Sequence, residues 1–276
     1  MKNDKCFNFT KEDFRNIRSV ISIQAFIRKY EIDKIMEDIC ENHFDNALEL
    51  GCGSGRYSKH LAFYCKKLTA IEYNERRLSA KNNEKITFIV GDAQDLSRFG
   101  DNEMDLIFSS NLIEHLSDID RCLAECRRVV KTDGQIIHTV PTRTWKFFHL
   151  LLYYPVAIEV LFLKIFSAQK ATALLETISP EIDCDSSLRP HDSAFSIKKH
   201  LLPKTHGVSK SHYSEFKNWG QKHWINIFKK NGLEILEIVR LPFYFGWEYN
   251  FRLILKLGNY LGMSSSTAYI LRKNKG

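Results

Sequence analysis

The sequence predicts an α/β fold, in which a mostly parallel sheet carries helices on both of its faces. Three observations predict it: short apolar runs alternate with helical stretches between residues 47 and 140, a glycine-rich turn follows the first run, and the second run ends on an acidic residue. Parallel strands that are covered on both faces read as short apolar runs because neither face meets water. The 276 residues suit one large domain, or one domain with an insertion.

The individual elements follow from this alternation. The strands are expected at residues 47–50, 68–72, 86–90, 105–109 and 135–140, and the helices between them at residues 55–65, 74–81 and 118–130. Upstream, residues 21–40 have the apolar spacing of an amphipathic helix. The alternation of strands and helices stops after Pro141 for about 70 residues and then resumes. Helices are expected at 214–231 and 249–261, and strands at 233–240 and 267–272.

Cysteine content and charge limit the class of protein. The seven cysteines form no CxxC pair and are odd in number, which favours neither a metal ribbon nor a disulfide framework and fits a reducing compartment. The first residues lack the apolar core of a secretory signal, so a cytoplasmic protein is expected. Residues 188–230 hold nine Lys or Arg against two acids. Such a segment either attracts anions or is a solvated face without a partner.

The turn after the first strand carries the chemistry. It reads Glu49-x-Gly51-x-Gly53-x-Gly55, and glycines let a backbone approach a ligand closely and adopt positive φ. Dinucleotide enzymes use G-x-G-x-x-G instead, and their third glycine would fall at Arg56. A carboxylate directly before the turn argues against a pyrophosphate and suits a cationic ligand.

Three further positions lie where such a ligand would need them. Glu72 ends the second strand and can accept hydrogen bonds from both hydroxyls of a ribose. Asp92 with Ala93 follows the third strand, where a carboxylate and a backbone amide can read an adenine edge. The fourth strand runs into Asn111. In an open α/β sheet, ligands bind at the carboxyl ends of the strands beside the topological switch point.

On these segments the chain resembles the class I S-adenosylmethionine-dependent methyltransferases, of the small-molecule type related to ubiquinone and menaquinone biosynthetic enzymes. The segments that carry the resemblance are ALELGCGSGRYSKHLA, LTAIEYNERRL, ITFIVGDAQDL, MDLIFSSNLIEHL and LAECRRVVKTDGQIIHTVP. The resemblance implies a Rossmann-like sheet of seven strands, with an antiparallel last strand at 267–272 and an α-rich insertion after the fifth strand. The expected parts are an N-terminal helical segment over the cofactor site (1–43), the cofactor-binding core (44–140), the insertion (141–213) and the rest of the core (214–276).

The resemblance also implies roles for these residues toward S-adenosylmethionine. Glu49 and the turn from Gly51 to Gly55 would hold the methionine part, Glu72 the ribose hydroxyls, and Tyr73 would flank the adenine face.

Asp92 and Ala93 would read the adenine, and Asn111 would lie near the amino-acid end. His115 matches a histidine that is common near the cofactor in this group; alternatively, it packs or hydrogen-bonds at a helix start.

Methyl transfer from a sulfonium is an in-line displacement that needs no metal and leaves S-adenosylhomocysteine as the product. A hydroxyl acceptor gains about 10²–10⁴-fold from a general base, and His is the usual base. His206 is the candidate in the insertion, because Gly207 beside it permits close approach.

The composition of the insertion indicates the chemical class of the acceptor. It opens with an apolar stretch at 145–166, in which only 12 uncharged residues separate Lys146 from Glu159, against about 20 needed to span a bilayer. The stretch would therefore either cap the site or lie in the interface of an anionic membrane. An apolar and a basic part together favour a small or lipid-linked acceptor of glycosidic or anionic chemistry. The oligomeric state stays open.

Two other functions compete with O-methylation. An RNA methyltransferase could use the basic segment together with four aromatic residues, Tyr213, Phe216, Trp219 and Trp224. No RNA-binding module and no Asn-Pro-Pro-Tyr motif accompany them, so nucleic acid is not the expected partner. A cofactor-binding subunit without catalysis is the third alternative.

Overall fold

The computed structural model describes residues 4–6, 20–37, 39, 44–78, 80–153, 205, 208–209, 211–244 and 252–274. Most of the predicted insertion, including His206, lies outside the described residues, and the predicted boundaries of the four parts stay predictions. None of the helices in these ranges is long and apolar enough to cross a membrane.

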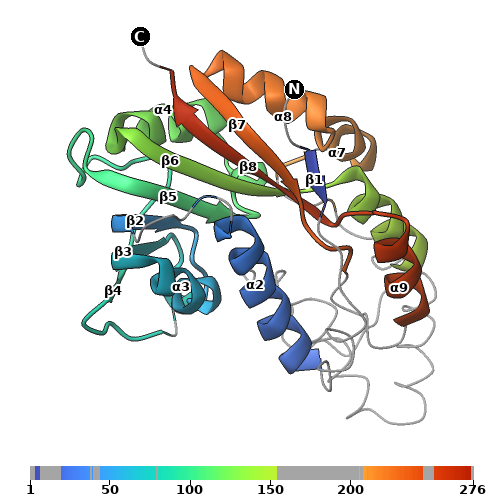
Figure 1. Ribbon diagram of the computed structural model, residues 1–276. Helices are drawn as coiled ribbons and strands as arrows, with labels where there is room; N and C mark the ends of the chain where they lie inside the picture. The colour runs from blue at the N-terminus through green and yellow to red at the C-terminus, as the bar shows by residue number, and fades with distance from the viewer. Residues whose placement is uncertain are drawn as a thin grey trace, which may run out of the picture.

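One eight-stranded sheet organises the chain, in the order β1-β7-β8-β6-β5-β2-β3-β4 (Figure 1). The strands are β1 (Asp4–Cys6), β2 (Phe44–Leu50), β3 (Cys65–Glu72), β4 (Ile86–Val90), β5 (Met104–Ser110), β6 (Val130–Pro141), β7 (Leu233–Arg240) and β8 (Ser266–Lys273). Strand β8 is antiparallel to β6 and β7, and all other neighbours are parallel. The predicted fold class and its antiparallel last strand are confirmed. The short β1 extends the seven-stranded sheet at the β7 edge, which the polar N-terminal residues did not predict.

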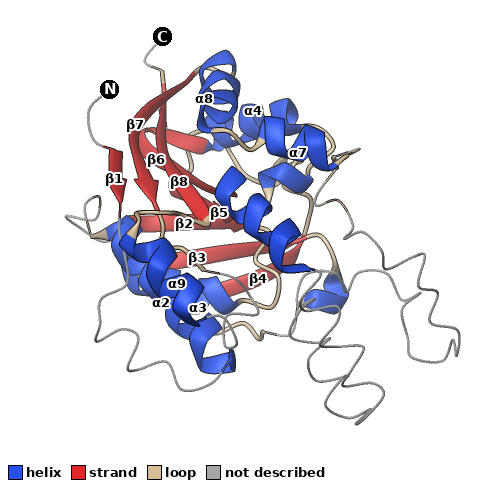
Figure 2. Ribbon diagram, turned by 90° about the vertical axis from the view of Figure 1, so that its right-hand side faces the viewer, coloured by secondary structure: helices blue, strands red, loops and turns tan. Residues whose placement is uncertain are grey.

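Helices cover both faces of the sheet (Figure 2). They are α2 (Val20–Met36), α3 (Arg56–Leu61), α4 (Ile119–Val129), α7 (His212–Asn218), α8 (Gln221–Lys230) and α9 (Arg252–Tyr260), and residues 143–153 are also helical. On one face, α2 and α3 bury Ile32, Ile35 and Leu61 against the strands. On the other face, α4 and α8 contribute Leu123 and Phe228 to a second core.

Helix α4 shows how local sequence sets these elements. Its start is capped by Asp118, whose carboxylate accepts a hydrogen bond from the Arg121 backbone N–H at 2.9 Å. Cys122 and Cys126 lie one turn apart on its buried face and are fully covered. They are small core residues.

The helix predicted at 74–81 is wrong. Among the described residues of this range only the 3₁₀ turn η2 (Glu75–Arg77) forms, with the Asn74 side chain accepting from the Arg76 N–H. The asparagines that follow use their side chains on the backbone of β4: Asn82 accepts from the Phe88 N–H at 2.7 Å and Asn83 from the Ile86 N–H at 2.8 Å. These bonds stabilise a turn in place of helix.

The single helix predicted at 214–231 is also wrong, because it is broken into α7 and α8. The break falls at Trp219 and Gly220, where Trp219 turns into the core with 4% exposure. A Cβ on Gly220 would lie 2.4 Å from Nη2 of Arg143, so the guanidinium packs directly against the backbone at this break.

Candidate functional site

The site lies where the order of the strands reverses. β2 pairs with β3 on one side and with β5 on the other, and all three are parallel. Their carboxyl ends therefore meet at one edge of the sheet, and the glycine-rich turn follows β2 at that edge.

All three glycines of the turn adopt left-handed backbone conformations, with φ of 69° at Gly51, 55° at Gly53 and 76° at Gly55. A Cβ on Gly51 would lie 2.7 Å from the Leu112 side chain, and one on Gly55 would lie 2.8 Å from the Cβ of Ala80. On Gly53 the nearest atom would be 4.0 Å away. Packing therefore requires two of the glycines, whereas Gly53 faces open space that a ligand can enter.

Glu72 ties the turn to the end of β3. Its side chain is 5% exposed; Oε2 accepts from the Gly53 N–H at 2.8 Å and Oε1 from the Asn74 N–H at 3.0 Å. Because each carboxylate oxygen has two lone-pair positions, both oxygens can accept one further hydrogen bond each. The geometry fits the predicted binding of two vicinal hydroxyls.

Glu49 lies under the turn with 2% exposure, and its Oε2 has no hydrogen-bond partner among the described residues. Burial raises the pKa of its carboxyl to about 7, against the opposing effects of the Ser58 hydroxyl and the Arg28 guanidinium; the Glu72 charge raises the pKa further. A buried carboxylate with an open acceptor position fits a cationic group such as a ligand ammonium.

The end of β4 completes this edge. The Gly91 N–H donates to the Glu72 carbonyl at 3.1 Å, which places the following residue, Asp92, beside the end of β3. The Asp92 carboxylate accepts from the backbone N–H of Gln94 at 2.8 Å and from its side-chain amide. Ala93 is 6% exposed and packs in the core.

The remaining predicted residues differ in their surroundings. Tyr73 is 76% exposed beside Glu72. Asn111 follows β5 with a φ of 47°, and its Oδ1 is buried without a hydrogen-bond partner in the part of the chain that the structure describes. His115 ends the 3₁₀ turn η3 (Ile113–His115), with 37% of its side chain exposed and Nε2 3.9 Å from the Glu114 carboxylate. The roles of these residues stay predictions.

Helix α2 supplies site residues that the sequence did not indicate. The Tyr57 hydroxyl donates to the buried Glu31 carboxylate, and the Arg28 guanidinium lies 4.5 Å from the centroid of the Tyr57 ring. These contacts hold α2 against α3 next to Glu49. The amphipathic pattern of residues 21–40 predicted the helix, but only the fold shows that its polar residues meet the glycine turn.

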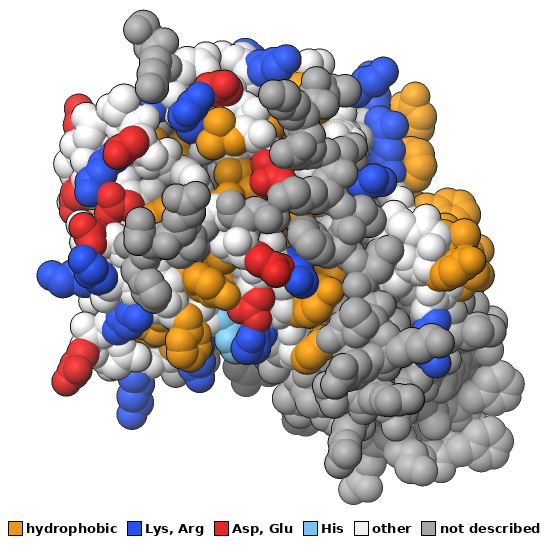
Figure 3. Space-filling view, viewed as in Figure 1, with side chains coloured by type: hydrophobic (Ala, Val, Ile, Leu, Met, Phe, Trp, Pro, Cys, Tyr) orange, Lys and Arg blue, Asp and Glu red, His pale blue; other side chains and the backbone are white. Residues whose placement is uncertain are grey.

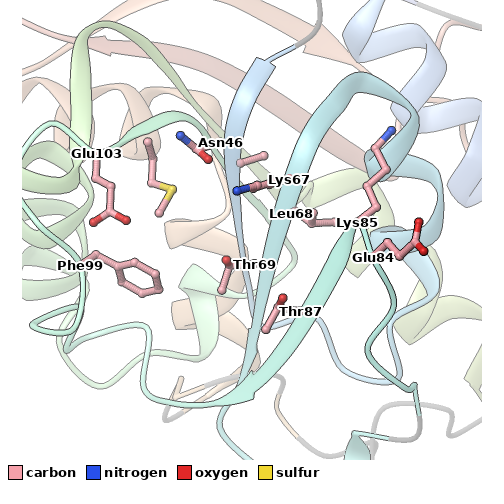
Figure 4. Close-up of a pocket in the computed structure, with 11 residues that line it drawn as sticks. Asn46, Lys67, Leu68, Thr69, Glu84, Lys85, Thr87, Phe99 and Glu103 are labelled. Atoms are coloured by element: carbon pink, nitrogen blue, oxygen red, sulfur yellow. The ribbon is translucent and has the colours of Figure 1, made fainter.

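Two cavities formed by described residues lie away from this turn. One, of about 290 Å³, lies at the amino ends of β2, β3 and β4, where Asn46, Lys67 and Lys85 line it (Figure 4). The other, of about 230 Å³, lies beyond the carboxyl end of β6. The described residues contain no group of three His, Cys, Asp or Glu side chains that could hold a metal ion.

Comparison with known proteins agrees with this geometry. Residues 48–138 match the family described as methyltransferase domain. The chain is 31% identical over 136 residues to YrhH of Bacillus subtilis strain 168, which is described as a methyltransferase, with 44% of this chain and 74% of that protein covered. It is 24% identical over 105 residues to a ubiquinone biosynthesis O-methyltransferase of Aromatoleum aromaticum, covering 36% of this chain and 45% of that protein, so the chain spans about half of that relative's length.

A solved structure shares the fold. It is the N-methyltransferase NodS of Bradyrhizobium japonicum, in complex with S-adenosylhomocysteine, with a TM-score of 0.50, 13% identity, and 90% of this chain and 87% of that chain covered. The chain belongs to the class I S-adenosylmethionine-dependent methyltransferases.

Proposed function

We propose that the protein transfers the methyl group of S-adenosylmethionine to an oxygen atom of a small or lipid-linked acceptor. One observation carries the proposal: the left-handed turn at Gly51–Gly55 offers open space at Gly53, between the buried carboxylates of Glu49 and Glu72. A nucleoside with a cationic amino-acid tail matches this arrangement, because one carboxylate can pair with an ammonium and the other can accept from a diol.

The bound cofactor would supply an electrophilic methyl group on a sulfonium. The protein itself would then bind the cofactor and orient it toward the acceptor. Glu49 would hold the ammonium and Glu72 the ribose, while Asp92 and the backbone of Ala93 would fix the adenine. Positioning of this kind contributes roughly 7–11 kcal/mol to catalysis.

A hydroxyl acceptor would lose its proton to a base. His115 lies four residues after Asn111 and is exposed enough to meet an acceptor; His206 is the second candidate. Replacing each by Ala and comparing kcat over a pH series tests them, because the base shifts the acidic limb of the profile whereas a packing residue does not.

Apolar surface near this edge suits an amphiphilic acceptor. The helix at 143–153 starts two residues after β6 and exposes Phe147 and Leu151, and α9 exposes Leu257 and Tyr260. Figure 3 shows hydrophobic side chains on the right of this face, where Figure 1 places these helices. The ubiquinone O-methyltransferase named above likewise supports an O-methyl acceptor. Salt-sensitive pelleting with anionic liposomes would extend the proposal to a membrane-bound acceptor.

Two of the four aromatic residues that favoured RNA are buried. Trp219 is 4% and Trp224 is 2% exposed, so neither ring can meet a base. Tyr213 and Phe216 are exposed, whereas Lys198, Lys199, Lys204 and Lys210 lie outside the described residues.

The test is a methyl-donor assay with isotopically labelled S-adenosylmethionine and fractionated lysate, followed by mass analysis of the labelled product. The proposal expects a product heavier by one methyl group, with the label on oxygen. Label on nitrogen would contradict O-methylation. Cofactor binding without any labelled product would favour a non-catalytic subunit.

A further inference from the structure

We propose that the cavity beyond the carboxyl end of β6 binds an anionic group of the acceptor, a phosphate or a carboxylate. Its link to the acceptor rests on the proposed function, but anion binding can be tested separately. The cavity has a volume of about 230 Å³. Pockets for whole small molecules measure roughly 300–1,000 Å³, so this cavity suits one functional group of a larger ligand.

Its position places it on the acceptor side of the molecule. The walls come from Val140 near the end of β6 and from residues 142–144 that follow it, together with Arg240 at the end of β7. Ser264 and Thr267 at the start of β8 and the break between α7 and α8 complete them. β6 is parallel to β5, and β5 to β2. The cavity and the glycine turn therefore lie at the same edge of the sheet.

Two arginines give the cavity a positive charge. The Nε of Arg240 is buried and has no hydrogen-bond partner among the described residues. Arg143 donates from Nη2 to the Lys217 carbonyl at 2.8 Å, which leaves its other N–H groups available. Neither arginine forms an ion pair within the described ranges, and no Asp or Glu is among the described residues that line the cavity.

The start of α8 adds to this charge. Its N-cap is Gly220, which has no side chain to accept from the free N–H groups, and the first turn holds no acidic residue. Instead, the Arg143 guanidinium packs directly against Gly220. The guanidinium therefore lies between the last carbonyls of α7, one of which it contacts, and the free N–H groups at the start of α8. Burial lowers the pKa of His223, one helical turn further on, and the charges of Arg143 and Lys217 lower it further.

The test measures binding of inorganic phosphate and of dihexanoyl phosphatidic acid to the full chain by calorimetry at low ionic strength. Arg240→Gln is expected to weaken both about tenfold or more, because a charge-assisted hydrogen bond is lost. Arg143→Gln, at an exposed position, repeats the test if Arg240→Gln does not fold. The probe that binds wild type more tightly identifies a free or a lipid-linked phosphate as the source.

Arg127→Gln is the matched control. Arg127 belongs to α4 and contacts the C-terminal end of α8, away from the cavity, where it donates to the Asn231 carbonyl. Equal weakening by this variant, or equal phosphate affinity in wild type, Arg240→Gln and Arg143→Gln, would overturn the inference. S-adenosylhomocysteine binding is measured on the same samples. Its absence would remove the proposed function, while phosphate loss confined to the two cavity variants would still support the anion site.

Discussion

At the scale of single residues, Glu49 has the most unusual environment in the site. Its carboxyl is buried, its pKa is raised to about 7 by burial, and one oxygen has no hydrogen-bond partner among the described residues. Because the folded state holds the proton more tightly than the unfolded state, this group favours folding at low pH. Its contribution is lost as the pH rises from about 4.5 to about 7.

The first prediction concerns this pH dependence. Between pH 5 and pH 8 the free energy of unfolding of wild type is expected to fall relative to that of Glu49→Gln by about 3 kcal/mol. Urea unfolding of both proteins at both pH values measures the difference, in which the other titrating groups cancel. Parallel pH profiles would contradict the assigned pKa shift.

The same ionisation governs ligand binding. Only ionised Glu49 can pair with an ammonium, so affinity for S-adenosylhomocysteine is expected to rise from pH 6 to pH 8 more steeply in wild type than in Glu49→Gln. Calorimetric titrations across this range measure it. A steeper rise in the variant, or none in either protein, speaks against the pairing.

The glycines form a matched pair for a third prediction. Gly55→Ala is expected to lower the free energy of unfolding by about 2–3 kcal/mol, since it adds both backbone strain and an overlap with Ala80. Gly53→Ala adds strain alone, about 1–2 kcal/mol, but fills the open side of the turn. We expect it to weaken S-adenosylhomocysteine binding at least tenfold. Full affinity in Gly53→Ala would show that the ligand does not approach there.

Much of this site could be predicted from the sequence, because its glycines and acids lie at or just after the carboxyl ends of strands. The motif predicted the positive φ of Gly51, Gly53 and Gly55, whereas the burial of Glu49 and Glu72 is seen only in the fold. The effects of Arg28 and Ser58 on the pKa of Glu49 could not be predicted, since they depend on how α2 and α3 pack.

At the scale of elements, the helix at 143–153 is joined to α7 by a buried ion pair. Lys146 and Glu215 contact each other and are both 0% exposed, and Lys146 Nζ also lies 5.7 Å from the centroid of the Trp219 ring. The start of the predicted insertion is thereby fixed to the C-terminal part of the core.

Removing one partner of this pair is expected to be costly. Glu215→Ala should lower the free energy of unfolding by about 3–5 kcal/mol, because Lys146 keeps a buried charge. The double variant Lys146→Met, Glu215→Leu should recover most of this loss, since no charge then remains buried. Urea unfolding measures both. A double variant no more stable than Glu215→Ala would mean that the charge is not the cause.

The bounds of some strands were predicted from the sequence, whereas those of two helices were not. β4 and β7 have the bounds that were predicted for them. The split between α7 and α8 and the loss of the 74–81 helix follow from contacts of Gly220 and of the asparagines before β4. Such contacts arise only after folding, so helical spacing alone does not reveal them.

At the scale of the whole molecule, the sheet places the glycine turn and the arginine-lined cavity at one edge. The glycine turn after β2 and the arginine-lined cavity after β6 open on the same side, and the helix at 143–153 and α9 add apolar surface beside them. This arrangement is the one that the proposed charged, amphiphilic acceptor would require.

The most direct test of the cofactor site is a calorimetric titration of S-adenosylhomocysteine into wild type, Glu72→Ala and Glu75→Ala. Glu75 is the matched control, because it is an exposed glutamate three residues further along the chain. We expect one site in wild type and unchanged affinity in Glu75→Ala. The affinity of Glu72→Ala is expected to be weaker by about 100-fold or more, because this variant loses two charge-assisted hydrogen bonds. The same affinity in all three proteins would contradict the assignment of the site.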